Sequence, residues 1–422
     1  MLPERIRRFA RWLGLNRTVA VVLLAVLFFG LGEQLWEPFL GVYLAALRDV
    51  KKTAGSVGTV SAGALFLIAA YACLRNFFEA FCYISGGNLT ARMGDRGSLL
   101  LFGVLSISGY FAFLLLPGPV MGVMAALLIL GWEPLSVPVT FTTVGSTVDK
   151  ANQGMAFALQ SIQKRLPKIL GPLIAGFLLG WAERTWETKE AGRIAGMQFL
   201  VAGALALGVV SLIIQYLYMP ERKASPPGPG MVALVRSFHP AVKSLLLAEV
   251  FTRWCDQFVR EFVALYLLVI RKVPVEQIGI LMAIQHLTAL ITYLPIGRLT
   301  RSTGLAPFVG LTFIFFALFP LVLVLVPDGW GLVAAFIVYG LREIGEPARK
   351  AMITSLIPEE VRARGVGLYW GLRATAIAPA AFAGAALWIW VGPEAAFYAA
   401  FASGCVGTAI FYLLARRFAG SP

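Results

Sequence analysis

The chain has 422 residues, of which 59% are hydrophobic and only 14% charged. Soluble domains carry about 25% charged and about 45–50% apolar residues, so this composition and a mean hydropathy of +0.78 exclude a soluble enzyme, a disordered regulator and a fibrous protein. The length accommodates roughly a dozen membrane helices of about 20 residues each. The sequence therefore predicts an all-α polytopic membrane protein in a lipid bilayer.

The net charge of +14 does not indicate nucleic-acid binding, because the basic residues lie mostly at the ends of apolar segments, where they set the orientation of membrane helices. Four cysteines lie singly in apolar stretches and predict neither disulfides nor a metal site; they are Cys73, Cys82, Cys255 and Cys405. We expect no cofactor.

Residues 1–17 carry five arginines, with apolar residues at helical spacing between them. This pattern predicts a cytoplasmic amphipathic segment that lies on the inner leaflet. A cleaved signal peptide is the competing interpretation. The apolar run that follows has no small-residue cleavage site and continues to Leu47, which argues against it.

Turn residues and charges divide the rest of the chain into twelve predicted spans. They are 18–46, 55–86, 98–116, 120–144, 153–182, 194–218, 241–270, 274–296, 305–326, 329–355, 364–391 and 393–415. Residues 220–240 form a polar linker rich in proline and glycine, so we expect one six-helix bundle at 18–219 and another at 241–422. Loops on the side of the N-terminus carry about twice as many Lys and Arg as the opposite loops. We therefore expect two cytoplasmic termini in a cell membrane, the inner membrane of a bacterium.

The two halves of the sequence repeat each other. Glu33-Gln34 is matched by Asp256-Gln257 after 223 positions, and the loop GGNLTARMGD is matched by IGRLTRSTG after 210 positions. The segment GPLIAG at 171–176 is echoed by APAAFAG at 378–384. Three matches in the same order predict two pseudo-symmetric bundles, which is typical of transporters built from internal repeats.

Charged residues occur inside seven predicted spans, and the eighth carries Gln285 and His286 instead. The third, sixth, ninth and twelfth spans have no charge in their interiors. A charged side chain at the bilayer centre costs roughly 2.5–3.5 kcal/mol, so such side chains face protein or water. We predict that eight helices surround a polar interior and that the four uncharged helices face lipid.

Four intramembrane carboxylates are candidates for proton coupling: Glu33, Asp256, Glu343 and Glu346. A buried carboxylate without a permanent partner is suited to proton exchange. Arg342 could instead hold a nearby acid in a static ion pair.

Other charges in the spans have structural interpretations. Arg75 and Glu79 lie four positions apart, and this spacing favours a structural pair. Arg349 and Lys350 are expected to extend to the membrane surface.

Lys164, Arg165 and Lys168 place three cations within five positions of the fifth span. Glu37 and Glu133 could neutralise them from neighbouring helices, or an anionic group of a substrate could do so. Polar and aromatic residues of the inner spans supply the predicted substrate-binding set: Glu37, Trp36, Glu133, Lys164, Arg165, Lys168, Gln257, Arg260, Gln285, Arg342, Tyr369 and Arg373.

The loop after the second span is similar to the signature G-x-L-a-D-[RK]-x-G-[RK]-[RK] of the major facilitator superfamily. The matching residues are Gly87, Leu89, Arg92, Gly94 and Arg96, whereas Ala91 stands at the acidic position and Asp95 at a usually basic one. The resemblance extends over nearly the whole chain and implies twelve helices in two bundles. In the family this loop latches the outward-facing state, which implies a gating loop formed by Gly87, Arg92, Gly94, Asp95 and Arg96. The altered acid departs from the usual chemistry of that latch.

Residues 171–176 are also similar to the G-P-x-x-G-G motif in the fifth helix of the family's exporters, with Ala175 replacing one glycine. The resemblance implies a monomeric secondary transporter that exports small amphipathic organic molecules by alternating access, coupled to protons. Import of organic anions or phosphorylated compounds, and flipping of lysolipids, are alternatives that would use the basic cluster. A membrane-embedded enzyme would need a His/Asp or metal constellation, and the chain has only His239 and His286.

Overall fold

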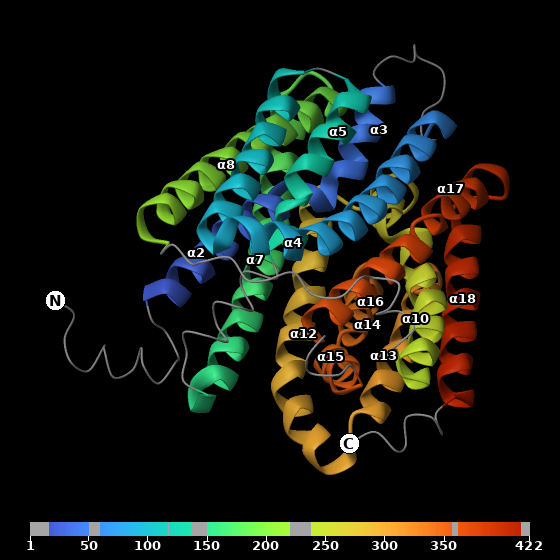
Figure 1. Cartoon of the computed structure of the whole chain (residues 1–422). Helices are drawn as coiled ribbons and strands as arrows, with labels where there is room; N and C mark the ends of the chain where they lie inside the picture. Colours follow the sequence, from blue (N-terminus) through green and yellow to red (C-terminus); the bar gives the residue numbers. More distant parts are fainter. Residues whose placement is uncertain are drawn as a thin grey trace. The chain divides into compact units, whose positions relative to one another are not determined.

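A computed structural model describes residues 17–49, 60–116, 118–136, 150–219, 238–356 and 362–414. All regular structure in these ranges is helical (Figure 1). Ten helical segments of the described chain are long and apolar enough to cross a membrane. The prediction of an all-α polytopic membrane protein is thereby confirmed. The predicted amphipathic segment and most of the predicted linker lie outside the described residues.

The helices of the first half follow the predicted spans. They are α2 (Arg17–Trp36), η1 (Glu37–Phe39), α3 (Leu40–Asp49), α4 (Ala62–Leu115), α5 (Pro119–Leu130), α7 (Lys150–Thr185) and α8 (Lys189–Tyr218). The first predicted span is interrupted at η1. Pro38 explains the interruption, because proline has no backbone N–H and disfavours the helical conformation of the residue before it.

The second and third predicted spans form one helical run, α4, where the sequence predicted a loop. The run bends at Gly94, whose φ of 74° and ψ of 171° are available to glycine alone. Gly304 occupies the equivalent position, at the same 210-residue offset that relates Gly87 to Gly297, and its φ is also positive, at 80°. The positive φ shared by the two glycines supports the internal repeat.

The second half also follows the prediction. Its helices are α10 (Pro240–Val259), η2 (Arg260–Phe262), α11 (Val263–Leu265), η3 (Tyr266–Ile270), α12 (Val275–Thr303), α13 (Ala306–Leu325), α14 (Trp330–Leu341), α15 (Glu346–Ser355), α16 (Arg362–Ile377), α17 (Ala380–Trp390) and α18 (Pro393–Leu413). The predicted spans 241–270 and 329–355 are not among the ten candidate spans. The first of these carries several charges, and the second is broken between α14 and α15.

Contacts within the chain define two compact units. Unit 1 comprises Met1–Glu37, Phe81–Gly171 and Gln198–Pro227, and unit 2 comprises Pro38–Ala80, Pro172–Met197 and Gly228–Pro422. The boundaries cut α4, α7 and α8, so these units differ from the predicted bundles 18–219 and 241–422. The division into two six-helix bundles therefore stays a prediction.

Within unit 1, polar side chains join α2 to two other helices. The Gln163 amide of α7 donates to the Leu23 carbonyl at 2.6 Å, and the Ser211 hydroxyl of α8 donates to the Ala25 carbonyl at 3.3 Å. Gly171 allows a further close approach, since a methyl group there would lie 2.6 Å from the backbone of Gln34. These contacts hold α7 beside the polar end of α2.

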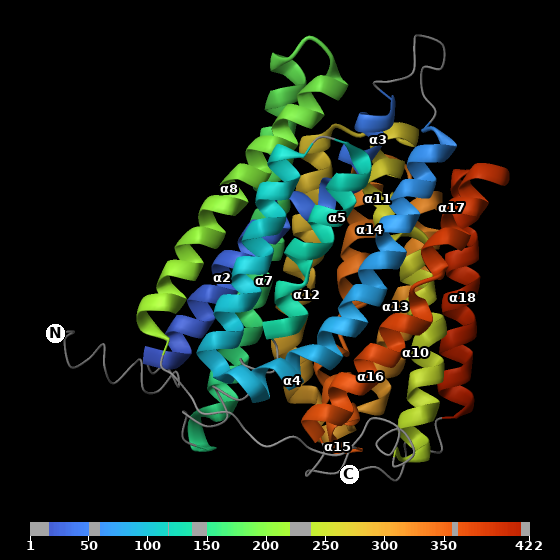
Figure 2. The ribbon, with the colours of Figure 1, turned by 45° about the horizontal axis from the view of Figure 1, so that its top comes forward.

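Within unit 2, α10 packs along α18 and α13 (Figure 2). Small residues permit this packing: a methyl group at Gly404 would lie 2.7 Å from Ala317, and one at Gly407 would lie 2.6 Å from the backbone nitrogen of Thr252. Of the helices predicted to face lipid, α8 and α18 bury only 33% of their most apolar windows, whereas α13 buries 50% because α10, α14 and α18 pack on it.

Candidate functional site

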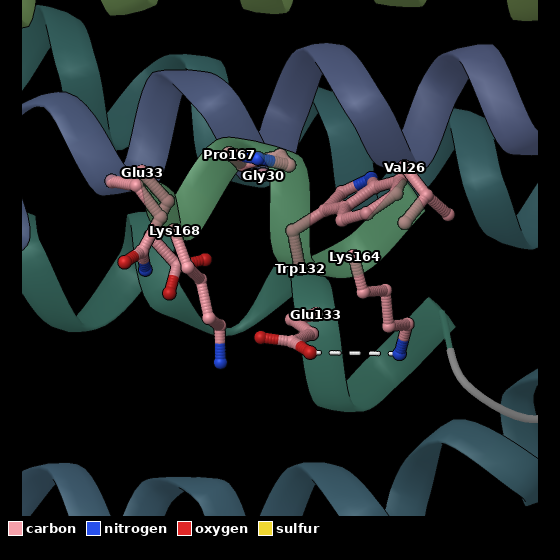
Figure 3. Close-up of a pocket in the computed structure, with 9 residues that line it drawn as sticks. Val26, Gly30, Glu33, Trp132, Glu133, Lys164, Pro167 and Lys168 are labelled. Carbon is pink, nitrogen blue, oxygen red and sulfur yellow. Dashed lines mark ion pairs between the residues drawn. The ribbon is translucent and has the colours of Figure 1, made fainter. Parts of the chain in front are cut away.

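A pocket of about 370 Å³ in unit 1 lies among α2, residues 132–136 and α7. It brings together four of the predicted site residues, which project into the same opening: Glu33, Glu133, Lys164 and Lys168 (Figure 3). Helical spacing explains the arrangement, because residues 164 and 168 are four apart on α7 and share one face. Val26, Gly30, Gln34, Trp132 and Pro167 complete the lining.

The pocket is charged on one side and apolar on the other. The Lys164 ammonium lies 3.6 Å from a Glu133 carboxylate oxygen, and the two side chains are 33% and 44% exposed. Lys168 makes no ion pair within the described part of the chain. Trp132 stacks on Phe29 with ring centroids 4.4 Å apart, and no described residue accepts a hydrogen bond from its buried indole nitrogen. The pocket can therefore hold an aromatic or aliphatic group beside charged groups of either sign.

Three other predicted binding residues of the first half lie elsewhere. Trp36 is completely buried, and its ring centroid lies 5.9 Å from that of Phe113, so Trp36 is a core residue. Glu37 is buried at the turn η1, and Arg165 is partly exposed on α7; neither lines the pocket.

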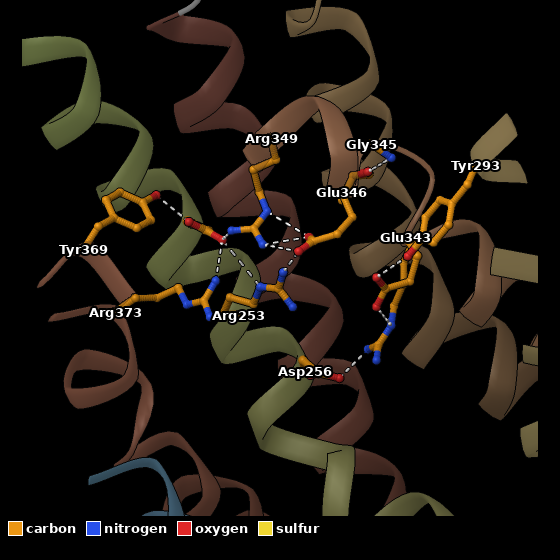
Figure 4. A network of polar contacts seen from close by, with 12 residues as sticks. Arg253, Asp256, Tyr293, Glu343, Gly345, Glu346, Arg349, Tyr369 and Arg373 are labelled. Carbon is orange, nitrogen blue, oxygen red and sulfur yellow. Dashed lines mark hydrogen bonds and ion pairs between the residues drawn. The ribbon is translucent and has the colours of Figure 1, made fainter. Parts of the chain in front are cut away.

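A network of buried ions lies in unit 2, among α10, α15 and α16 (Figure 4). Its centre is Arg349, which is 2% exposed. Arg349 donates to Glu249 and, at 2.6 and 2.7 Å, to both carboxylate oxygens of Glu346. The expectation that Arg349 extends to the membrane surface is therefore wrong. The two buried carboxylates hold its guanidinium inside, since a buried charge is retained where counter-charges satisfy its donors.

Two more arginines surround the same carboxylates. Arg373 donates to a Glu249 oxygen at 3.0 Å, and Arg253 lies 3.7 Å from that oxygen and 3.5 Å from Glu346. The Tyr369 hydroxyl donates to the second oxygen of Glu249. We call Glu249, Arg253, Glu346, Arg349 and Arg373 the arginine cluster. Three cations and two carboxylates give the arginine cluster a formal charge of +1.

Asp256 and Glu343 share Arg342 beside the arginine cluster. Arg342 donates to Asp256, and its Nε lies 4.0 Å from Glu343. The Tyr293 hydroxyl contacts Glu343 at 3.5 Å. We call Asp256, Arg342 and Glu343 the carboxylate pair with its arginine; its formal charge is −1.

Phe316 separates the two charged groups. Its ring lies 4.6 Å from the Arg253 guanidinium and 4.8 Å from the Arg342 guanidinium, within the range of cation–π attraction. Tyr339 covers Arg342 from another side at 4.0 Å. The aromatic rings supply partial compensation for two buried cations.

The remaining predicted residues of unit 2 lie outside both charged groups. Gln257 accepts from the Asn76 amide at 3.1 Å, Arg260 lies 3.9 Å from Glu261, and Gln285 is buried on α12. Arg75 pairs with Glu79 at 3.0 Å, as predicted, and also reaches Glu261 at 3.4 Å.

The predicted gating residues lie in and around the bend of α4. Gly87 is inside the helix, Gly94 makes the bend, and Asp95 is buried directly after it. Arg92 is exposed. Arg96 donates to the Tyr216 carbonyl at 2.7 Å and lies 5.3 Å from the Tyr216 ring, which connects the bend to the end of α8.

Sequence reasoning did not assign a role in the site to Glu249, Arg253 or Arg349. The available signal was the spacing of Glu249, Arg253, Asp256 and Arg260, which puts the four side chains on one stripe of a helix. Nothing in the spacing indicated that α15 and α16 would bring two arginines to the same stripe.

Comparisons with known proteins define the fold. Searches with family models and among curated protein sequences found no match. Among solved structures, the human organic anion transporter MFSD10 (TETRAN) matches with a TM-score of 0.68 at 14% identity, over 94% of this chain and 99% of that one. A peptide transporter POT in complex with sulfate matches with a TM-score of 0.69 at 16% identity, over 94% of each chain.

A POT family transporter in complex with 5-aminolevulinic acid matches with a TM-score of 0.70 at 16% identity, over 96% of this chain and 97% of that one. These matches show the fold, and together with the ten apolar helical segments they support a multi-pass membrane protein. The chain shares the fold of these transporters over nearly its whole length, in agreement with the fold that the sequence predicted.

Proposed function

We propose that this chain is a proton-coupled secondary transporter that exports small amphipathic organic molecules by alternating access. In this proposal it works as a monomer in the inner membrane of a bacterium, with both termini in the cytoplasm. The observation that carries the proposal is the sharing of Arg342 by Asp256 and Glu343.

The pocket of unit 1 is the proposed substrate site. Its lining combines apolar side chains with charged groups of both signs, which is the pattern of sites for small organic molecules. The Trp132 ring, which stacks on the buried Phe29, would contact the apolar part of the substrate. Lys164, Lys168 and Glu133 would contact its polar part. A substrate with separate apolar and charged groups fits such a lining better than a purely apolar molecule does.

The carboxylate pair with its arginine is the proposed proton site. Asp256 and Glu343 both face Arg342, and a proton bound by one of them would lower the negative charge at this position. A proton on Asp256 or Glu343 would leave the other carboxylate paired with Arg342. Glu33 in the pocket and Glu346 in the arginine cluster remain further candidates for proton coupling.

Export is supported by the packing of the G-P-x-x-A-G segment. A methyl group at Gly176 would lie 3.0 Å from the Val275 carbonyl, and one at Gly279 would overlap the Pro172 carbonyl. The small residues therefore bring α7 and α12 into close contact, as expected for the motif that resembles the exporters' fifth-helix signature.

Import of organic anions is the second candidate function. It is favoured by Lys168, which has no ion-pair partner in the described ranges, and by Lys164 beside it. An organic anion transporter is among the structural neighbours. A lysolipid flippase would use the same cations for a phosphate headgroup.

Transport of norfloxacin, a fluorescent amphipathic zwitterion, into proteoliposomes tests the proposal. The wild type should accumulate it against its gradient when a pH gradient is imposed, whereas Asp256→Asn should lose this accumulation and keep exchange of norfloxacin across the membrane. Asp328→Asn is the matched control, because Asp328 is 66% exposed in an ion pair with Arg271. Proton-driven accumulation by Asp256→Asn at the wild-type level would remove Asp256 from the mechanism.

Replacing both Lys164 and Lys168 by glutamine separates the candidates. Export of an amphipathic molecule should lose only part of its affinity, because the aromatic wall and Glu133 remain. Transport of an anion such as benzoate, or flipping of a lysolipid, should lose most of its affinity.

A further inference from the structure

The arginine cluster has one more positive charge than its internal contacts use. Arg349 fills the space between Glu249 and Glu346 and donates through its Nε, Nη1 and Nη2 atoms. These three residues have one negative charge in excess, and Arg253 also donates to Glu346 at 3.5 Å. Arg253 and Arg373 then add two positive charges to a group that needs one.

Arg253 and Arg373 also compete for the same acceptor. Both approach a single oxygen of Glu249, at 3.7 and 3.0 Å, and Arg349 donates to that oxygen as well. One carboxylate oxygen cannot satisfy three guanidinium groups, since it offers about two acceptor sites. Arg373 accordingly has a buried Nε for which the described residues supply no hydrogen-bond partner.

The two outer arginines of the arginine cluster are partly exposed, although the Arg373 Nε atom itself is buried. The side chains of Arg253 and Arg373 are each 17% exposed, whereas Glu249 is completely buried. A guanidinium edge turned to acyl chains is costly, so the exposed edges face an aqueous space. Two neighbouring guanidinium groups with free donors match the oxygens of a carboxylate or phosphoryl group.

We propose that Arg253 and Arg373 form an anion subsite, separate from the pocket of unit 1, that binds the carboxylate or phosphoryl group of a transported molecule. This proposal rests on the proposed transport function, and it specifies one part of the substrate, an anionic headgroup. Binding the anion brings the arginine cluster from +1 to neutrality. Glu249 and Arg349 act as positioning residues that hold the two arginines side by side.

The excess positive charge predicts a different thermal stability for Arg373→Gln than a purely structural role of Arg373 does. Arg373→Gln leaves two arginines facing two carboxylates, so this variant should be as resistant to thermal unfolding as the wild type. A purely structural counter-charge at Arg373 would instead give a variant of reduced stability.

Binding of benzoate to the purified full-length protein in phosphatidylcholine nanodiscs tests the subsite, with neutral benzamide as the reference ligand. Arg373→Gln and Arg253→Gln should each weaken benzoate binding at least tenfold and leave benzamide binding unchanged. Lys243→Gln, an exposed cation elsewhere on α10, should bind benzoate as the wild type does. Unchanged benzoate binding by both arginine variants would overturn the proposal, and so would a tenfold loss confined to Lys164→Gln/Lys168→Gln.

Nanodiscs with 30% phosphatidylglycerol distinguish a lipid headgroup from a transported anion. Equal benzoate affinity in both lipid compositions supports a transported anion, whereas competition by phosphatidylglycerol would overturn that assignment in favour of a bound lipid. The binding assay uses no proton gradient. Failure of the subsite would therefore leave the test of proton coupling at Asp256 untouched, and failure of proton coupling would leave benzoate binding untouched.

Discussion

Glu249→Gln is expected to be among the most destabilising conservative substitutions in unit 2. Glu249 is completely buried and accepts from Arg349, Arg373 and the Tyr369 hydroxyl. Replacing the carboxylate by an amide raises the formal charge of the arginine cluster from +1 to +2 in a desolvated site. Removal of one partner from a buried ion pair costs about 3–5 kcal/mol, because it leaves uncompensated charge behind.

The assay is reversible unfolding of the purified protein in mixed micelles, with a double-mutant cycle. Adding Arg373→Gln to Glu249→Gln returns the formal charge to +1, so the double variant should recover about 1–3 kcal/mol, the usual coupling energy of residues in one ionic network. Arg184→Gln is the control for loss of an ion pair: Arg184 is 66% exposed in its pair with Glu276, and loss of an exposed pair costs about 0–1 kcal/mol. If Glu249→Gln lowers the free energy of unfolding by less than Arg184→Gln does, the account of a desolvated network is refuted.

Three further predictions concern the backbone, a helix contact and the aromatic ring between the charged groups. Gly94→Ala and Gly304→Ala should each cost about 1–3 kcal/mol of unfolding free energy, because both glycines have positive φ. Gly203→Ala is the control and should cost nothing, since Gly203 has open space around it in α8. Equal losses at all three sites would contradict the argument. Gly279→Val should abolish norfloxacin transport because its side chain would overlap the Pro172 carbonyl and separate α7 from α12, whereas transport at the wild-type rate would show that this contact is dispensable. Phe316→Leu removes the ring between Arg253 and Arg342 and should destabilise the protein by about 0.5–2 kcal/mol beyond the matched change Phe319→Leu, measured by the same unfolding assay; equal losses would exclude the cation–π contribution.

The sequence predicted the helices well because the physical signal for them is strong. Long apolar segments bounded by glycine, proline and charge identify membrane helices, and the observed ends of α8 and α18 lie within a few residues of the predicted ones. The bend of α4 was predicted as a loop, since a helix that continues on both sides of a single glycine has the same local composition as a short turn.

The candidate site was predicted only in part. Residues four apart on one helix, such as Lys164 and Lys168, could be assigned to one face, and the pocket confirms that they lie together. The sequence also suggested Glu133 as a partner of the basic cluster and Arg342 as a partner of a nearby acid, and both pairings are present. The pairing of Arg349 and Arg373 with Glu249 could not be derived, because it depends on how α10, α15 and α16 pack. Arg349 is the clearest example: its distance from the predicted membrane centre favoured extension to the surface, yet Glu249 from another helix holds it inside.

Proton movement during transport tests the central claim most directly. The wild type, Asp256→Asn or Glu343→Gln would be reconstituted into proteoliposomes loaded with the pH dye pyranine. Norfloxacin would then be added outside without an imposed pH gradient. The account predicts a proton flux that accompanies norfloxacin in the wild type and is lost in both variants, while each variant still exchanges norfloxacin. A proton flux of the same size in all three proteins would contradict a proton site at Asp256, Arg342 and Glu343.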